Sequence, residues 1–271
     1  MSFLIALGTA AVISYAAYRV GSLNRSGALA ATLVGTVILG AGGWAWSVLL
    51  LVFFISSSLL TRTFQGRKRD LIKNYAKGGA RDAGQVLGNG GLATFFAGLN
   101  YFLPHEPWVW IGFAAALAAV NADTWATELG VLSPVRPRLI TNLKPVEKGT
   151  SGGVSAWGTL AALAGAAIIA LPAYLLAVPA LGPATPNPAW MLILPVTIAG
   201  LLGSLFDSFL GATVQAMYFC PTCQKDTERH PLHHCGIPTT LKRGWSWLGN
   251  DWVNLGCGLF AVGVAMLGQL V

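Results

Sequence analysis

Charged residues are scarce in this chain. Of its 271 residues only 10% are Asp, Glu, Lys or Arg, whereas 54% are hydrophobic, and a typical soluble domain has about 25% charged residues. A chain this apolar lacks the polar surface that a soluble globular protein needs. Its solvent is therefore lipid, and its length suits roughly eight spans of ~20 residues with connecting loops. We expect an all-α, polytopic integral membrane protein of about eight helices with a cytoplasmic polar cap.

Other features are missing as well. The first apolar segment has no Lys or Arg before Arg19 and no small-residue cleavage site, so we interpret it as a retained span rather than a signal peptide. Four cysteines are too few for a disulfide framework. The net charge of +7 could indicate a nucleic-acid partner, but membrane topology explains it better. We therefore expect membrane lipids as partners and no nucleic acid.

Apolar runs separated by polar residues predict where the spans lie. Gly42 and Gly43 barely divide the second run from the third, so these two could also form one bent segment. Charge favours two separate spans, because all 17 Lys and Arg residues then fall in odd-numbered loops. The positive-inside rule places those loops in the cytoplasm and both termini outside the cell membrane. The predicted spans are residues 2–20, 27–42, 43–61, 83–103, 107–130, 152–180, 189–217 and 252–271, within a single integral membrane domain, 1–271, that has a cytoplasmic loop at 218–251.

Three acids interrupt these apolar segments. Asp123, Glu128 and Asp207 would each cost ~2.5–3.5 kcal/mol in hydrocarbon, so they must face the bundle interior or a wet cavity. Asp123 and Glu128 lie about 140° apart around an ideal helix, and they could share a site if the helix is broken. Ser204, Asp207 and Ser208 follow i, i+3, i+4 spacing and form one stripe, although such serines often serve only helix packing. Carboxylates at one membrane depth favour Mg²⁺.

The sequence LKPVEKGTSGGVSAWG resembles a phosphate-binding loop in its composition. Lys144 and Lys148 supply positive charge. Gly149, Gly152 and Gly153 allow backbone N–H groups to be exposed, and Thr150 and Ser151 add hydroxyl donors. A helix follows, and its N-terminus favours anions. A glycine-rich connector with topogenic lysines is the simpler alternative.

Two further segments place polar residues beside these groups. Arg81, Gln85 and Asn89 follow i, i+4, i+8 spacing and form one polar face on a helix that enters the membrane. Asn250, Asp251 and Asn254 stand at the start of the last span, where Asp251 could join the carboxylates. Asn250 could instead be an ordinary N-cap.

The cysteine loop CPTCQKDTERHPLHHCG predicts a closed tetrahedral Zn²⁺ site. Cys220, Cys223 and Cys235 supply thiolates, and His230, His233 or His234 completes the set; we assign His234. A reducing cytoplasm disfavours disulfides, so we interpret the zinc as structural.

Four segments together resemble a family of membrane proteins that includes plant phytyl-phosphate kinase and eukaryotic transmembrane protein 19. They are ARDAGQVLGNGG, NADTWATELG, KGTSGGVS and GSLFDSFLGATVQ, with WLGNDWVN as a weaker fifth. A fainter resemblance links the chain to CTP-dependent phosphatidate cytidylyltransferases and polyprenol kinases. The His-Gly-Gly…Asp-Arg ending of the cytidylyltransferases is replaced here by WLGNDWVN.

The resemblance implies a CTP-dependent, or other NTP-dependent, kinase that converts an isoprenoid monophosphate such as phytyl or geranylgeranyl phosphate to the diphosphate. Alternatives are a cytidylyltransferase that makes a CDP-lipid, a lipid transporter and a non-enzymatic lipid-binding module. We assign catalysis to Asp123, Glu128, Asp207 and Lys148, and Mg²⁺ binding to Asp123, Glu128, Asp207 and Asp251. The expected substrate and phosphate ligands are Arg81, Asn89, Asn121, Lys144, Gly149, Thr150, Ser151, Gly152, Gly153, Ser204, Ser208, Asn250 and Asn254.

Overall fold

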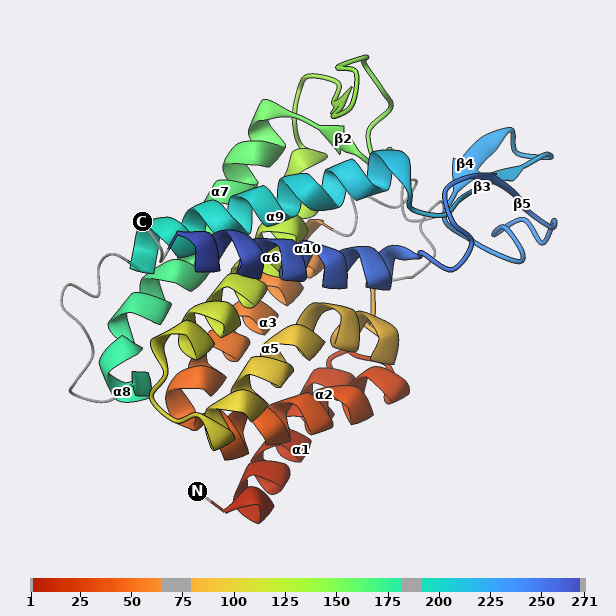
Figure 1. The fold of residues 1–271 in the computed structure, drawn as a ribbon. Coiled ribbons are helices and arrows are strands. Elements are labelled where there is room, and N and C mark those ends of the chain that lie inside the picture. The colour runs from red at the N-terminus through yellow and green to blue at the C-terminus, as the bar shows by residue number, and fades with distance from the viewer. Residues whose placement is uncertain (1, 65–78, 182–191, 269–271) are drawn as a thin grey trace.

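A computed structural model describes residues 2–64, 79–181 and 192–268, and most of them form helices (Figure 1). The helices are α1 (Phe3–Arg19), α2 (Arg25–Val37), η1 (Ile38–Gly42), α3 (Trp44–Phe64), α5 (Ala83–Phe102), α6 (Pro107–Gly130), α7 (Ala156–Leu175), α8 (Ala177–Leu181), α9 (Ile193–Thr213) and α10 (Asn250–Leu267).

Every segment that was predicted to span contains a helix. The second and third are separate, because Gly43 turns the chain with a φ of 85°, and the segment 152–180 forms α7 and α8. Six helices within the described residues are long and apolar enough to cross a membrane: α2 with η1, α3, α6, α7, α9 and α10. α1 has only 17 residues and α5 carries several polar side chains, so the count of eight spans stays a prediction. Residues 189–191 and 269–271 of the predicted spans, and the basic residues at 67–77, lie outside the described residues.

α6 is the central helix of the bundle. It contacts α3, α5, α7, α9 and α10, and it is buried without interruption from Val109 to Ala122. Small residues make this packing possible. A Cβ added at Gly200 of α9 would lie 2.7 Å from the Ala166 Cβ of α7 and 2.9 Å from the Ala118 Cβ of α6. Such residues let helices approach closely in lipid, where little hydrophobic force drives association.

The loops contain short strands that the all-α prediction missed. β1 (Arg138–Leu139) pairs with β2 (Gly153–Val154), and a three-stranded antiparallel sheet has the order β4-β3-β5. Its strands are β3 (Met217–Cys220), β4 (Lys225–Thr227) and β5 (Thr240–Arg243). We call residues 214–249 the cap; it projects beyond one end of the helices (Figure 1). Strands this short carry no readable alternation, so local sequence could not predict them.

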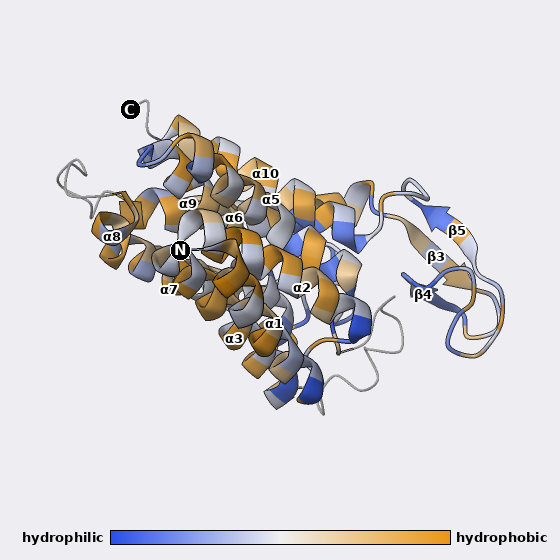
Figure 2. Cartoon of the chain, turned by 90° about the horizontal axis from the view of Figure 1, so that it is seen from below, coloured by the Kyte–Doolittle hydropathy of each residue, from blue (hydrophilic) through white to orange (hydrophobic). Residues whose placement is uncertain are grey.

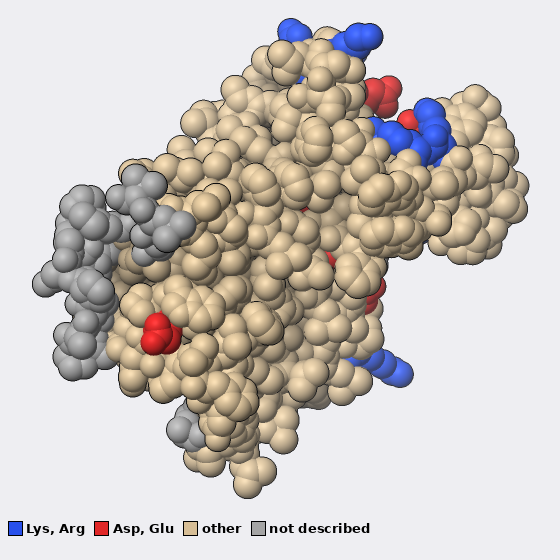
Figure 3. All heavy atoms as spheres, in the orientation of Figure 1, with Lys and Arg blue, Asp and Glu red and all other residues tan. Residues whose placement is uncertain are grey.

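One end of the bundle is polar. α3, α6 and α9 end there, whereas α5, α7 and α10 begin there. The α1–α2 turn joins this end, because the Arg81 backbone N–H donates to the Ser22 carbonyl at 3.0 Å. Blue, hydrophilic residues gather toward the cap in Figure 2, and the Lys and Arg side chains visible in Figure 3 lie mainly on the same side. The surface along the helices is mostly apolar, as expected of a surface in contact with lipid.

Candidate functional site

A cavity of about 620 Å³ opens at the polar end. Its wall comes from the ends of α3, α6 and α9, the starts of α5, α7 and α10, the loop of residues 148–155, and the cap. Six helices that are far apart in sequence thus contribute to a single space, which we call the polar cavity.

Four carboxylates that the sequence predicted line this cavity: Asp123, Glu128, Asp207 and Asp251. α6 runs unbroken from Pro107 to Gly130, yet both of its acids line the cavity, so the shared site does not require a break in the helix. Glu128 Oε1 accepts a hydrogen bond from Thr61 Oγ1 of α3 at 3.0 Å. Asp207 Oδ2 is buried and has no hydrogen-bond partner among the described residues. A buried carboxylate oxygen without a protein donor suits a cation or a substrate donor.

The glycine-rich loop packs directly onto α9. Gly152 has a φ of 84°, and a Cβ there would lie 2.5 Å from the Ala212 Cβ. A Cβ at Gly211 would likewise lie 2.6 Å from Ser151 Oγ. Ser151 Oγ donates a hydrogen bond to Gln215 Oε1 at 2.8 Å. The two glycines therefore set how closely the loop approaches the helix that carries Asp207.

Two cationic side chains line the polar cavity among the described residues, Lys148 and Arg81. Lys148 Nζ donates to the carbonyls of Val131 at 3.2 Å and Ser133 at 2.5 Å, which ties the glycine-rich loop to the end of α6. The Arg81 guanidinium lies 5.4 Å from the ring centroid of Phe53. Burial lowers the pKa of Arg81 to about 10, although the negative charge of Glu128 acts to raise it. Arg81 therefore stays protonated at neutral pH.

Three helix N-termini lie at the cavity. α5 begins with a capping box between Asp82 and Gln85, and the Ser155 side chain caps α7 by accepting from the Gly158 N–H at 3.1 Å. Gly249, not Asn250, is the N-cap of α10, so the alternative reading of Asn250 as an N-cap is wrong. Free N–H groups at such ends, together with the helix dipole, favour anions.

The structure separates the predicted ligands into two groups. Asn121 and Lys144 do not line the polar cavity. Asn121 is fully buried and donates to the Gly165 carbonyl at 2.7 Å, so it joins α6 to α7, whereas Lys144 is exposed on the β1–β2 hairpin. The predicted residues that do line it, besides the carboxylates and Lys148, are Arg81, Asn89, Gly149, Thr150, Ser151, Gly152, Gly153, Ser204, Ser208, Asn250 and Asn254.

Sequence reasoning assigned no residue of the cap to the wall of the site. Tyr218, Glu228, His230 and Trp247 line the polar cavity, and Glu228 Oε1 accepts from Gln215 Nε2 at 3.1 Å. Hydrogen bonds thus run from Ser151 of the glycine-rich loop to Gln215 at the start of the cap and on to Glu228. Glu228 and His230 lie in the cysteine loop, and no spacing in the sequence connects that loop with the helices.

Comparison with known proteins agrees with this architecture. The family model of the integral membrane protein DUF92 matches residues 8–262. The chain belongs to the DUF92 family. It is 37% identical over 237 residues to "Protein PGR" of Arabidopsis thaliana, covering 82% of both chains. It is 36% identical over 190 residues to an uncharacterised membrane protein, MJ0933, of Methanocaldococcus jannaschii, covering 70% of this chain and 74% of that one.

A further relative is "Protein VTE6, chloroplastic" of Arabidopsis thaliana, which is 26% identical over 240 residues that cover 87% of this chain and 62% of that protein. No solved structure matches the chain. The family resemblance that the sequence motifs predicted is thus confirmed for the DUF92 family as a whole.

In this DUF92 protein an apolar pocket of about 100 Å³ adjoins the polar cavity. It lies among α1, α2, α3 and α5, and its wall includes Ala31 and Leu50. Arg81, Gln85 and Asn89 line both spaces. The polar face that the sequence predicted on α5 therefore forms the boundary between them.

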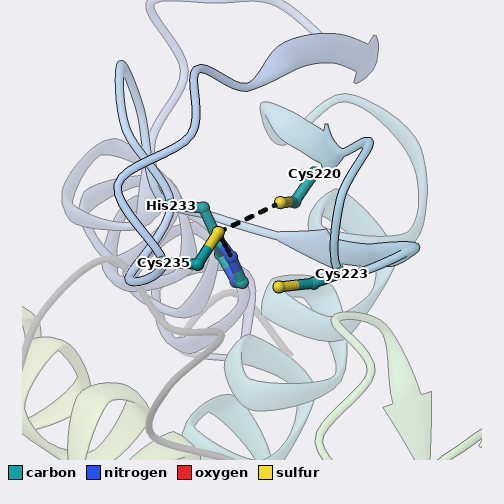
Figure 4. A group of neighbouring side chains, drawn as sticks. All are labelled: Cys220, Cys223, His233 and Cys235. Carbon is teal, nitrogen blue, oxygen red and sulfur yellow. Dashed lines mark hydrogen bonds between the residues drawn. The ribbon is translucent and has the colours of Figure 1, made fainter.

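The cysteine loop forms a second cluster (Figure 4). Side-chain atoms of Cys220, Cys223, His233 and Cys235 lie within 4.8 Å of one another. The histidine assigned from the sequence was His234, but the structure brings His233 to the sulfurs, and His234 contacts the far side of its ring. Two adjacent histidines project in different directions, and only the fold of the loop decides which one points inward.

Proposed function

We propose that this DUF92 protein is a kinase that converts an isoprenoid monophosphate, such as phytyl or geranylgeranyl phosphate, to the diphosphate, with CTP or another nucleoside triphosphate as donor. The observation that carries the proposal is the junction of the two spaces at Arg81, Gln85 and Asn89. One amphiphile can place its phosphate in the polar cavity and the start of its chain in the apolar pocket. The motif resemblance to the family of plant phytyl-phosphate kinase supports the same class of substrate.

The proposed reaction needs no general base. A phosphate monoester carries a charge of about −1.5 to −2 at pH 7, so its oxygen is already a nucleophile. That oxygen attacks the γ-phosphorus, the bond from the γ-phosphorus to the β–γ bridging oxygen breaks, and the nucleoside diphosphate leaves with the electron pair. Catalysis then consists of positioning and charge neutralisation.

Charge at the site supports a requirement for a divalent cation. Among the described residues that line the polar cavity, five carboxylates stand against the two cations Arg81 and Lys148. Two anionic substrates would be repelled unless metal ions offset this excess. Asp123, Glu128, Asp207 and Asp251 would hold Mg²⁺, which prefers carboxylate oxygens. When bound, Mg²⁺ neutralises phosphate oxygens and orients them.

The protein's own groups would then hold the phosphates. Arg81 lies at the boundary with the apolar pocket, where the acceptor phosphate enters. The backbone N–H groups of the glycine-rich loop and the start of α7 suit the phosphates of the nucleotide. Lys148 acts chiefly by anchoring that loop through the two carbonyls. Asn89, Ser204, Ser208, Asn250 and Asn254 offer amide and hydroxyl groups around the reacting centre.

We also propose that the polar cavity opens at the cytoplasmic face of the cell membrane and that both termini lie outside. The support is the collection of Lys and Arg at the cavity end. The topology is checked with reporters fused to the C-terminus. Alkaline phosphatase, which is active only outside the cytoplasm, should be active there, and a fluorescent protein that folds only in the cytoplasm should stay dark. The opposite pair of results would reverse the orientation.

The activity is tested with purified full-length protein, geranylgeranyl or phytyl phosphate, Mg²⁺ and each of the four nucleoside triphosphates. Mass spectrometry should detect the prenyl diphosphate with at least one donor. Asp207→Asn should lower the rate by about 100-fold or more, because one of the proposed Mg²⁺ ligands of the polar cavity loses its charge. Asp226→Asn is the matched control, since Asp226 is exposed on the cap in an ion pair with Lys242 at 2.7 Å. It should leave the rate unchanged.

Other products would contradict the kinase. Pyrophosphate together with a CDP-linked lipid would indicate cytidylyl transfer. Absence of the diphosphate with every donor, with lipid flux across proteoliposomes that needs no nucleotide, would indicate transport.

A further inference from the structure

The cluster of Cys220, Cys223, His233 and Cys235 has the geometry of a tetrahedral metal site (Figure 4). Cys220 Sγ lies 3.6 Å from Cys235 Sγ, and His233 Nδ1 lies 3.3 Å from the same sulfur. In a tetrahedron, a zinc ion bound to sulfur at ~2.3 Å and to nitrogen at ~2.0 Å requires an S···S separation of about 3.8 Å and an S···N separation of about 3.5 Å. All four cysteines of the chain are free thiols. We infer that these four side chains bind a structural zinc ion that fixes the cap at the mouth of the polar cavity.

Two separate turns present the ligands in pairs. Cys220 ends β3 and Cys223 lies in the turn to β4, whereas His233 and Cys235 lie in the connection from β4 to β5. In each pair the residue after the second ligand is left-handed, with a φ of 52° at Gln224 and 82° at Gly236. These turns fold each pair back on itself. The ligand side chains thus bring together chain segments about ten residues apart.

A hydrogen bond on the far side of its ring positions the histidine ligand. His233 is buried, and its Nε2 lies 2.9 Å from His234 Nδ1. If Nδ1 binds the metal, Nε2–H donates to His234, which fixes the tautomer and the ring orientation. Such outer contacts accompany almost every zinc-bound histidine. His234 is therefore a positioning residue for the site.

The cap needs such a link because its own core is small. Its strands have four, three and four residues, and so few side chains bury little apolar surface. The cap still has to hold a wall of the polar cavity in place. Tyr218 and His230 stack with ring centroids 4.4 Å apart, and both line that cavity together with Glu228. None of the four proposed ligands lines the polar cavity, so the zinc site is separate from the proposed reaction.

The test measures metal content and does not depend on enzyme activity. Full-length protein purified with reductant, supplied with ZnCl₂ and desalted should contain about one zinc ion per chain by elemental mass spectrometry. Titration of this wild-type protein with a mercurial should release the zinc as three thiols react. Trypsin should then cut after Lys225 and Arg229, which lie between the two ligand pairs, whereas the zinc-loaded protein should resist cleavage there.

Variants assign the ligands. Cys223→Ser and His233→Ala should lose the zinc, whereas Cys257→Ala, the matched control in the core of α10, should keep it. His234→Ala should bind zinc about 10–100-fold more weakly. Zinc content far below one per chain in the wild type, or a disulfide between two of the three loop cysteines in the reduced preparation, would overturn the inference. So would equal zinc loss in Cys257→Ala and Cys223→Ser.

Discussion

The close contact between the glycine-rich loop and α9 can be tested by adding one methyl group. Gly152→Ala places a Cβ 2.5 Å from the Ala212 Cβ, whereas ordinary contact begins at 3.4 Å, so the loop must recede by about 0.9 Å. The left-handed backbone adds about 1–2 kcal/mol of strain for a residue with a Cβ. The Ser151–Gln215 hydrogen bond of 2.8 Å cannot survive such a shift unchanged. Because a misplacement of about 1 Å can lower a rate by about 100-fold, we expect kcat for diphosphate synthesis to fall by about that factor.

Gly43→Ala is the control for this prediction. Gly43 has a φ of 85°, close to the 84° of Gly152, but a Cβ there meets no atom within 4 Å. Both variants therefore incur the backbone strain, and thermal unfolding in detergent should show that both are destabilised. Only Gly152→Ala should lose activity. If kcat falls equally in the two variants, or in neither, the loop does not depend on its distance from α9 and the reasoning is wrong.

Three further predictions concern individual residues. Asn121→Ala should lower the free energy of unfolding by about 1–3 kcal/mol, because the buried Gly165 carbonyl loses its hydrogen-bond donor. The KM values should stay unchanged. A raised KM for the nucleotide would indicate that Asn121 does contribute to the site. Lys148→Ala should lower kcat because Lys148 anchors the glycine-rich loop, whereas Lys144→Ala should leave kcat unchanged because Lys144 is exposed. Steady-state assays of the two variants would check this. Ala31→Phe should raise the KM for geranylgeranyl phosphate but not the KM for the short-chain dimethylallyl phosphate. Ala11→Phe is the control, since Ala11 is half-buried and lies outside the apolar pocket, and it should change neither KM. Equal effects of Ala31→Phe on both acceptors would contradict a chain-binding pocket.

The sequence by itself determined that this protein is an integral membrane protein and that its polar groups gather at one end of its helices. Long apolar runs allow only helices in lipid, because every backbone polar group must be satisfied within its segment. The free-energy cost of placing a charged side chain in hydrocarbon required Asp123, Glu128 and Asp207 to face the interior of the helix bundle. The spacing of Lys and Arg separated the second span from the third, as the turn at Gly43 confirms. These inferences depend on composition and local periodicity, which the sequence contains directly.

The tertiary structure decided which of these polar groups meet. Asn121 and Asp123 are two residues apart, yet only Asp123 lines the polar cavity, because side chains two positions apart on a helix point in different directions. The apolar pocket is created by α1, α2, α3 and α5 together, and no single segment encodes it. His233 instead of His234 faces the sulfurs because the fold of the loop orients the two rings. Such choices depend on contacts between distant segments, and pairwise spacing along one chain does not specify them.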